Sequence, residues 1–367
     1  VDFGALIFNP VAQVKFVHTV AAGYVTGAIF VLAISSWYLL NKRDLGFARR
    51  SFAIASAFGL ASILSVIVLG DESGYEIGDV QKTKLAAIEA EWETHPAPAG
   101  FTLFGLPNQE EMRTDYAVKI PWALGLIATR SLDEEVKGIK DLIVEHEARI
   151  RNGMTAYALL EQLRAGDQSS ATIAAFEAVK NDLGYGLLLK KYTANVVDAS
   201  DEQIRLAARD TIPHVFSLFW SFRAMVASGF LMLALFACAF WASARKNEES
   251  KPWLLRWALL SLPLPWVAAQ TGWYVAEHGR QPWSIGEVLP THLSASSLSS
   301  GDVWGSLIAL VAFYSLLLVV EMYLMIRFAR LGPSSLHTGR YHFERPAVAA
   351  ELPIPHGGQA AGQPVHA

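Results

Sequence analysis

The sequence predicts an all-α, polytopic membrane protein, and three observations support this fold class. Of the 367 residues, 52% are hydrophobic and 17% are charged, whereas soluble globular proteins carry about 25% charged residues. The mean hydropathy is +0.29. Several apolar stretches are long enough to cross a bilayer. The single cysteine, Cys238, argues against a disulfide scaffold, and the net charge of -4 argues against a nucleic-acid-binding protein.

These apolar stretches define the expected membrane helices. A helix needs about 20 predominantly apolar residues to cross the bilayer. Five stretches meet this requirement, and polar segments separate them from one another. We therefore expect five membrane helices, over Val11–Leu40, Ser51–Gly70, His214–Ala244, Trp253–Val275 and Asp302–Ile326.

Basic residues predict how these helices are oriented, because short loops rich in Lys and Arg stay in the cytoplasm. If the five helices alternate in direction, three basic segments fall on one side of the membrane. Their basic residues are Lys42, Arg43, Arg49 and Arg50, then Arg245, Lys246 and Lys251, and finally Arg327, Arg330 and Arg340. We therefore expect the segment between the second and third helices to lie on the outer side.

This outer segment, residues 71–213, is called the loop domain below. It is too long to be a simple connection, since most connections have fewer than about 15 residues. Helices are expected over Val80–Glu93 and Leu132–Leu163, and a Pro/Gly-rich surface connection over residues 95–109. The predicted organisation is two membrane helices in 1–70, the loop domain in 71–213, three membrane helices in 214–330 and a partly disordered tail in 331–367.

Several polar residues fall within or at the ends of the expected membrane helices. An ionisable group inside a bilayer costs about 2.5 to 3.5 kcal/mol, so each needs a partner or a function. The candidates are Lys15, His18, Arg223, Met225, Glu277, Arg280 and Glu321. His18 lies roughly 10 Å along the first helix, and Met225 lies at a comparable depth on the third. Imidazole and thioether groups at one level can ligate a low-spin haem, with nearby cations neutralising its propionates.

Each of these residues also has an ordinary structural interpretation. His18 can be a hydrogen-bonded packing residue, and a methionine in a membrane helix usually fills space. Glu277 and Arg280 are three residues apart, so on a continuing helix they would form an interfacial ion pair. Two other kinds of protein therefore stay open: a non-redox transporter that holds an anionic substrate, and a scaffold subunit without cofactors.

Four longer motifs resemble the larger, haem-bearing subunit of cytochrome bd quinol oxidases. They are NPVAQVKFVHTV at 9–20, VLGDESGYEIGDVQKTKLAAIEAEWET at 68–94, GWYVAEHGRQPW at 272–283 and ARLGPSSLHTGRYHFE at 329–344. The resemblance extends over nearly the whole chain. The family's subunit begins with about four further membrane helices, and this chain starts at Val1 without them. The resemblance therefore implies the C-terminal portion of such a subunit.

The resemblance also implies haem ligands at particular positions. His18 and Met225 match the axial ligands of the low-spin haem b558, and Glu277 matches the ligand of the high-spin haem b595. The proximal ligand of haem d belongs to the helices that precede the matching part. The residues that correspond to the haem propionate environment are Lys15, Arg223 and Arg280.

Within the loop domain, the resemblance implies a quinol-binding site. Lys84 and Glu89 match residues implicated in quinol oxidation, and Asp71 and Tyr75 lie in a motif of the same loop. A carboxylate close to a quinol hydroxyl can accept its proton, so Glu89 is the expected base, while Lys84 would bind or polarise the quinol oxygen. From the residues alone, Lys84 and Glu89 could instead lie on a solvated helix face.

A member of this family is expected to act in a bacterial terminal oxidase. The complex would oxidise ubiquinol or menaquinol at the outer face and pass electrons through its haems. It would reduce oxygen to water with protons from the cytoplasm, which makes the enzyme electrogenic. The expected partners are a second membrane subunit, small accessory subunits and the lipid bilayer, with no nucleic acid. The expected location is the inner membrane, with a periplasmic loop domain and a cytoplasmic C-terminus.

Overall fold

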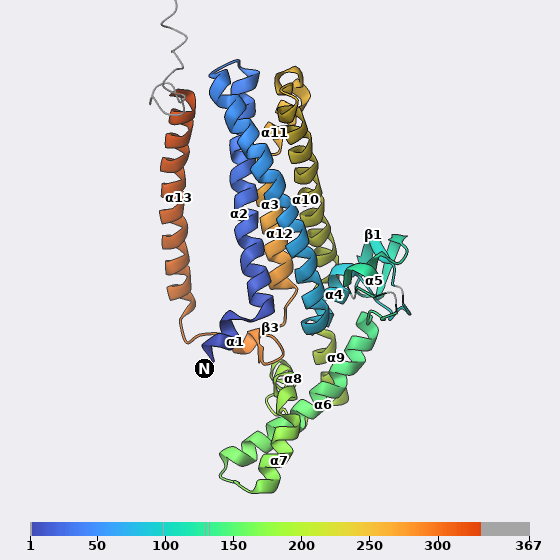
Figure 1. Cartoon of the computed structure of the whole chain (residues 1–367). Helices are drawn as coiled ribbons and strands as arrows, with labels where there is room; N and C mark the ends of the chain where they lie inside the picture. The colour runs from blue at the N-terminus through green and yellow to red at the C-terminus, as the bar shows by residue number, and fades with distance from the viewer. Residues whose placement is uncertain (1, 98, 129, 132, 332–367) are drawn as a thin grey trace, which may run out of the picture.

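The structure, a computed structural model, describes residues 2–331 except residues 98, 129 and 132 (Figure 1). Long helices form an elongated bundle, and a smaller group of elements extends from one end of it. We call this the loop end of the bundle. Among the described residues, four helices are long and apolar enough to cross a membrane, which confirms a polytopic helical membrane protein. The predicted tail lies outside the described residues, apart from Leu331.

Three of these helices, α2 (Pro10–Leu40), α3 (Leu45–Val80) and α10 (Val215–Ala244), form the centre of the bundle. Their bounds follow local sequence signals. Asn9 accepts a hydrogen bond from the Ala12 amide and precedes a proline in the first turn of α2, and His214 caps α10 in the same way through Ser217. The helices expected over Val11–Leu40 and His214–Ala244 are therefore confirmed.

The helix α3 is longer than the expected span Ser51–Gly70. It has 36 residues, so it is about 54 Å long, whereas the hydrocarbon core of a bilayer is about 30 Å thick. Its last turns therefore extend beyond the membrane at the loop end. Asp71 and Tyr75 lie on this extension.

The fourth expected helix, over Trp253–Val275, is not continuous, so the expectation of five unbroken membrane helices is wrong by one. The segment forms α11 (Pro252–Leu260) and α12 (Leu264–His278), with a break between them. Pro263 and Pro265 lie at this break. A proline lacks the amide hydrogen and clashes with the preceding turn, so a helix is interrupted there. Both pieces still pack against the bundle beside α2 and α10.

The last helix, α13 (Ser300–Leu331), stands apart from the bundle (Figure 1). None of its residues is buried, although it is rich in Leu, Val and Phe. Hydrogen bonds tie its far end to the bundle, from the Tyr38 hydroxyl to the Ala329 carbonyl at 2.7 Å and from Arg43 to the Arg330 carbonyl. The helix expected over Asp302–Ile326 is confirmed, and its apolar surface is bare in this chain.

Short elements make up the rest of the described chain. The helix expected over Val80–Glu93 is shorter, as α4 (Lys82–Glu89), and the one expected over Leu132–Leu163 is α6 (Ile139–Arg164). The expected surface connection contains a strand, β1 (Phe101–Asn108), which pairs with β2 (Arg113–Ile120) in an antiparallel hairpin. The Pro/Gly-rich composition of this segment gave no indication of a strand. The remaining elements are α1 (Phe3–Ile7), α5 (Ala123–Ala128), α7 (Ser170–Val179), α8 (Leu183–Leu188), α9 (Asp201–Arg209), β3 (Trp283–Ile285) and β4 (Leu289–Pro290).

Two large hydrophobic cores hold these parts together, and a small third cluster contains Ala99, Leu124 and Val136. One core fills the bundle between α2, α3, α10 and α11, with Ile29, Leu32 and Phe236 at its centre. The other core joins the loop domain to the bundle, because it contains Leu142 of α6 and Tyr185 of α8 together with Phe219 of α10. We call this second region the junction. The helix α4 contributes Ala86 and Ile88 to the junction, so its polar residues are placed where the loop domain meets the bundle.

Candidate functional site

The helix α4 carries two charged residues into the junction. Lys84 and Glu89 are each only 3% exposed, so the solvated helix face that the residues alone left open is excluded. The helix ends where Ala90 adopts a left-handed conformation with φ of 52°. Its amide bonds back to the Ala86 and Ala87 carbonyls. This tight end changes the direction of the chain after Glu89, and Ala90 and Trp92 stay within the junction core.

Glu89 is paired with Arg223 of α10, whose Nη2 lies 3.1 Å from Glu89 Oε2. The guanidinium also donates to backbone carbonyls, from Nη1 to Ile88 at 2.8 Å and from Nε to Thr102 at 3.1 Å. Its plane lies over the Phe219 ring, with the central carbon 3.3 Å from the ring centroid. One buried cation therefore connects α10, the end of α4 and strand β1.

The environment of Glu89 brings its protonation equilibrium close to neutral pH. Burial disfavours the charged carboxylate and raises its pKa to about 7, while the charge and the hydrogen bond of Arg223 act in the opposite direction. A base is most effective when its pKa lies near the working pH. Glu89 is therefore suited to accept and release a proton at neutral pH.

Lys84 reaches the C-terminal end of α12. Its Nζ donates to the Ala276 carbonyl at 3.1 Å, one of the carbonyls that have no partner within the helix. The pKa of Lys84 is lowered to about 8, chiefly by burial and also by the charges of Lys15 and Arg280, while Glu277 acts in the opposite direction. These effects indicate that the charges of Lys15, Glu277 and Arg280 all lie near Lys84 at the loop end of the bundle.

Glu277 and Arg280 form an ion pair with each other. They are three residues apart at the end of α12, and both side chains are about two-fifths exposed. The pairing that helix spacing predicts is thus present in the chain by itself. Gly279 between them lies against the Lys84 side chain, since a Cβ there would be 2.7 Å from Lys84 Cε. The same Cβ would lie 2.5 Å from the Val275 carbonyl oxygen, and this backbone contact is what favours glycine at the position.

His18 on α2 and Met225 on α10 have few polar partners. The Nδ1 of His18 is buried and has no hydrogen bond of good geometry within the described residues, although the Val66 backbone lies nearby. Each side chain rests against a glycine. A Cβ on Gly70 would be 3.4 Å from His18 Cε1, and one on Gly272 would be 2.8 Å from Met225 Sδ. The helices α3 and α12 thus leave room for both potential ligands.

Two other predicted residues, Asp71 and Tyr75, lie on the extension of α3. Arg130, which follows α5, approaches Asp71 to 3.5 Å and also pairs with Glu72. Its guanidinium carbon lies 4.3 Å from the centroid of the Tyr75 ring. Arg130 therefore fastens the segment after the hairpin to the end of α3.

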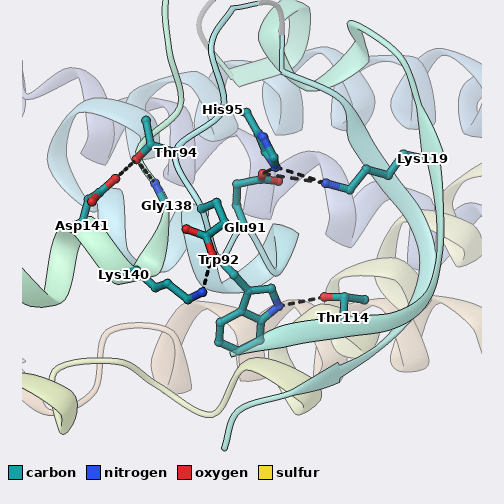
Figure 2. A network of polar contacts seen from close by, with 10 residues as sticks. Glu91, Trp92, Thr94, His95, Thr114, Lys119, Gly138, Lys140 and Asp141 are labelled. Atoms are coloured by element: carbon teal, nitrogen blue, oxygen red, sulfur yellow. Dashed lines mark hydrogen bonds and ion pairs between the residues drawn. The ribbon is translucent and has the colours of Figure 1, made fainter. Parts of the chain in front are cut away.

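The sequence interpretation missed a second buried carboxylate, Glu91. It is 1% exposed, and its Oε1 lies 2.9 Å from His95 Nε2 and 3.9 Å from Lys119 Nζ. Figure 2 shows the side chains of both His95 and Lys119 directed toward this carboxylate. Glu91 and His95 are four residues apart, a spacing at which an acid and a histidine can pair. The expected helix ended at Glu93, before His95, so the sequence interpretation did not recognise this pair.

The described residues contain no group of three or more His, Cys, Asp or Glu side chains that could hold a metal ion. A haem iron makes a different demand, because the porphyrin supplies four ligands and the protein only one or two. His18, Met225 and Glu277 are suitable by type. The unpartnered Nδ1 of His18 and the glycines beside His18 and Met225 are consistent with a bulky group between the helices.

Comparisons with known proteins agree on one family. The family described as cytochrome bd terminal oxidase subunit I matches residues 1–333. The chain is 46% identical over 337 residues to the cytochrome bd-II ubiquinol oxidase subunit 1 of Escherichia coli, covering 92% of this chain and 66% of that protein. It is 29% identical over 332 residues to the cytochrome bd ubiquinol oxidase subunit 1 of Bacillus subtilis, covering 90% and 59%.

A solved structure has a similar fold. The bd oxidase from Geobacillus thermodenitrificans superposes with a TM-score of 0.63 at 23% identity, over 90% of this chain and 60% of that chain. The chain thus spans about three-fifths to two-thirds of the length of the relatives it matches. Residues 1–333, which the family model matches, include the junction and every candidate residue described above.

Proposed function

Because the chain belongs to the family of cytochrome bd terminal oxidase subunit I, we propose that it supplies the quinol-oxidising site of a bacterial terminal oxidase. The observation that carries this proposal is the pair of buried charges on α4, with Glu89 held by Arg223 and Lys84 held by the end of α12. Burying charged groups is costly, and buried groups with perturbed pKa values cluster at functional sites. The substrate class is a quinol such as ubiquinol or menaquinol.

In this mechanism, Glu89 takes the proton of a quinol hydroxyl. Its raised pKa allows it to accept the proton and release it again near neutral pH. Lys84 donates a hydrogen bond to a quinol oxygen. Because its pKa is lowered to about 8, Lys84 loses its proton more easily than an ordinary lysine when the charge of the bound substrate changes. Arg223 holds Glu89 in place through a fixed set of backbone contacts. Glu89 is therefore already held in position before a substrate binds.

Haems held in the bundle would supply the electron-transfer chemistry. His18 and Met225 would hold the low-spin haem b558, and Glu277 would hold the high-spin haem b595. Lys15, Arg223 and Arg280 would stabilise the propionates by their charge. A bound haem carries one electron at a time.

The proposed arrangement in the membrane places the loop domain in the periplasm and the C-terminus in the cytoplasm of an inner membrane. The positive-inside distribution of Lys and Arg supports this orientation. Quinol protons would then be released outside, while the protons for water come from the cytoplasm, which makes the reaction electrogenic. The bare apolar surface of α13 is consistent with further helices, a second membrane subunit, accessory subunits or lipid around it.

A quinol-dependent assay on the assembled complex tests this proposal. We expect oxygen uptake with ubiquinol or menaquinol, and a reduced-minus-oxidised spectrum with b-type and d-type haem bands. Glu89→Gln should lower turnover by about 100-fold, the low end for loss of a general base, with the haem bands intact. Glu248→Gln is a matched control, because Glu248 is also a buried carboxylate but lies at the opposite end of the bundle. A colourless complex would favour a transporter or scaffold.

A further inference from the structure

Glu91 is a buried carboxylate that the proposed reaction does not use. Neither of its oxygens receives a hydrogen bond of good geometry within the described residues, and only 1% of the residue is exposed. A buried carboxylate is costly unless it is well paired. Its closest ionisable partner is His95, which can itself gain or lose a proton near neutral pH. The site therefore places two proton-exchanging groups in contact.

The surrounding backbone fixes Glu91 on the inside and His95 toward the surface. The Ile139 amide donates to the Glu91 carbonyl at 2.8 Å, and the Lys140 amide donates to the Trp92 carbonyl at 3.1 Å. The Trp92 indole donates to Thr114 of β2 at 2.8 Å, as Figure 2 shows. The segment is thus held between α6 and the hairpin. The His95 side chain is 42% exposed, whereas that of Glu91 is 1% exposed.

Glu91 also lies next to the proposed quinol site. Only Ala90, in its left-handed conformation, separates it from Glu89. The two carboxylates interact, since the charge of Glu89 is among the causes that raise the pKa of Glu91. A proton can pass between two carboxylates directly or through one water molecule. The residues therefore form a series from the buried junction to the surface: Glu89, Glu91 and His95.

We propose that Glu91 and His95 form the exit path by which protons from the quinol reach the outer solvent. This inference rests on the proposed function and deepens it. The proton leaves the quinol hydroxyl for the Glu89 carboxylate and then moves to the Glu91 carboxylate. His95 accepts it on Nε2 and gives up a proton from the ring to water. The electrons would be taken up by the haems of the complex, so the relay itself involves only acid–base steps.

The electrostatics of the neighbourhood make His95 a transient carrier of the proton. The pKa of Glu91 is raised to about 7, because burial outweighs the lowering effect of Lys119 and Glu89 adds to the rise. Burial and Lys119 lower the pKa of His95, and Glu93 acts in the opposite direction. Lys140 of α6 faces Glu93 and pairs with it. His95 therefore holds a proton only weakly and passes it on to solvent.

The first test is Glu91→Gln in the assembled complex that contains the full-length subunit. We expect quinol-dependent oxygen uptake to fall at least about tenfold in kcat, because water replaces a positioned carboxylate poorly. The KM for quinol and the haem spectrum should stay unchanged. Electrons supplied by ascorbate and a one-electron mediator release no quinol protons, so uptake with this donor should also stay unchanged. Glu111→Gln, on the exposed turn of the same hairpin, is the control.

The second test uses His95→Ala with imidazole in the buffer. His95 is partly exposed, so we expect the alanine variant to lose quinol-driven turnover and added imidazole to restore it. Wild-type turnover in Glu91→Gln, or an equal loss with the mediator, would overturn the relay and leave the proposed function intact. A wild-type complex without quinol-dependent oxygen uptake would overturn both.

Discussion

The junction and the interior of the bundle treat their polar residues in opposite ways. At the junction, the chain itself supplies the partners: Arg223 binds Glu89 and several carbonyls, and Lys84 binds Ala276. Deeper in the bundle, His18 and Met225 meet glycines, and the Nδ1 of His18 has no hydrogen bond of good geometry among the described residues.

This difference distinguishes polar residues that have their partners within the described chain from those that do not. The junction is preorganised, because its charged groups are held before any substrate arrives. In the bundle interior, His18 and Met225 are potential ligands, and the buried Nδ1 of His18 has no hydrogen bond of good geometry among the described residues. We therefore expect substitutions at the junction to affect stability and proton transfer, and substitutions at His18 or Met225 to affect the haem spectrum.

The largest expected effect belongs to Met225→Leu. Leucine has a similar volume, so the bundle should remain folded, but it has no sulfur to bind iron. We expect the low-spin haem band to disappear from the reduced-minus-oxidised spectrum, and quinol-driven turnover with it. Met232→Leu is the matched control, since Met232 is buried on the same helix without a glycine of another helix at its sulfur. An unchanged spectrum would remove Met225 from the proposed ligands.

The sequence predicted the bundle well because apolar length is a local property. It predicted α2 and α10 nearly to the residue. It failed at Pro263, where two short helices replace one, because overall hydropathy outweighed the helix-breaking effect of proline in that interpretation. It also failed at β1, whose pairing with β2 depends on a partner strand rather than on local composition.

The candidate site was predictable by residue but not by partner. A family motif pointed to Glu89 for quinol, whereas Arg223 was singled out as an ionisable residue in an expected membrane helix and was linked by the resemblance to haem. Their ion pair joins positions 134 residues apart, and nothing in either local sequence specifies that contact. Glu91 was missed for a related reason. Its burial is produced by α6 and the hairpin, which close over it from distant parts of the chain.

A second prediction concerns the preorganised side of the comparison. Arg223→Met removes one partner of a buried ion pair and leaves Glu89 without its cation, which typically costs about 3 to 5 kcal/mol. We expect a lower unfolding temperature of the complex and loss of attachment of β1 and α4 to α10, measured by hydrogen exchange. Arg245→Met is the control, because Arg245 stacks on Trp241 at the other end of the same helix. Equal stability of the two variants would contradict the assigned role of Arg223.

The smallest expected effect separates the function of Glu91 from its stability. The pKa of Glu91 is raised from 4.5 to about 7 in the folded protein, so the native state binds more protons than the unfolded state between these values. Wild-type stability therefore decreases as the pH rises through this range. Gln stays neutral, so Glu91→Gln should unfold a few degrees higher than wild type at pH 8, and this advantage should disappear by pH 4.5.

Differential scanning calorimetry of both complexes at several pH values measures this difference, with Glu111→Gln as the control for an exposed carboxylate. A residue kept only for structure would make its replacement less stable and leave turnover unchanged. A residue kept for proton transfer should give a variant that is more stable at pH 8 and slower with quinol. Destabilisation at pH 8 would show that His95 and Lys119 more than compensate for the burial of Glu91, and would place this carboxylate with the preorganised groups of the junction.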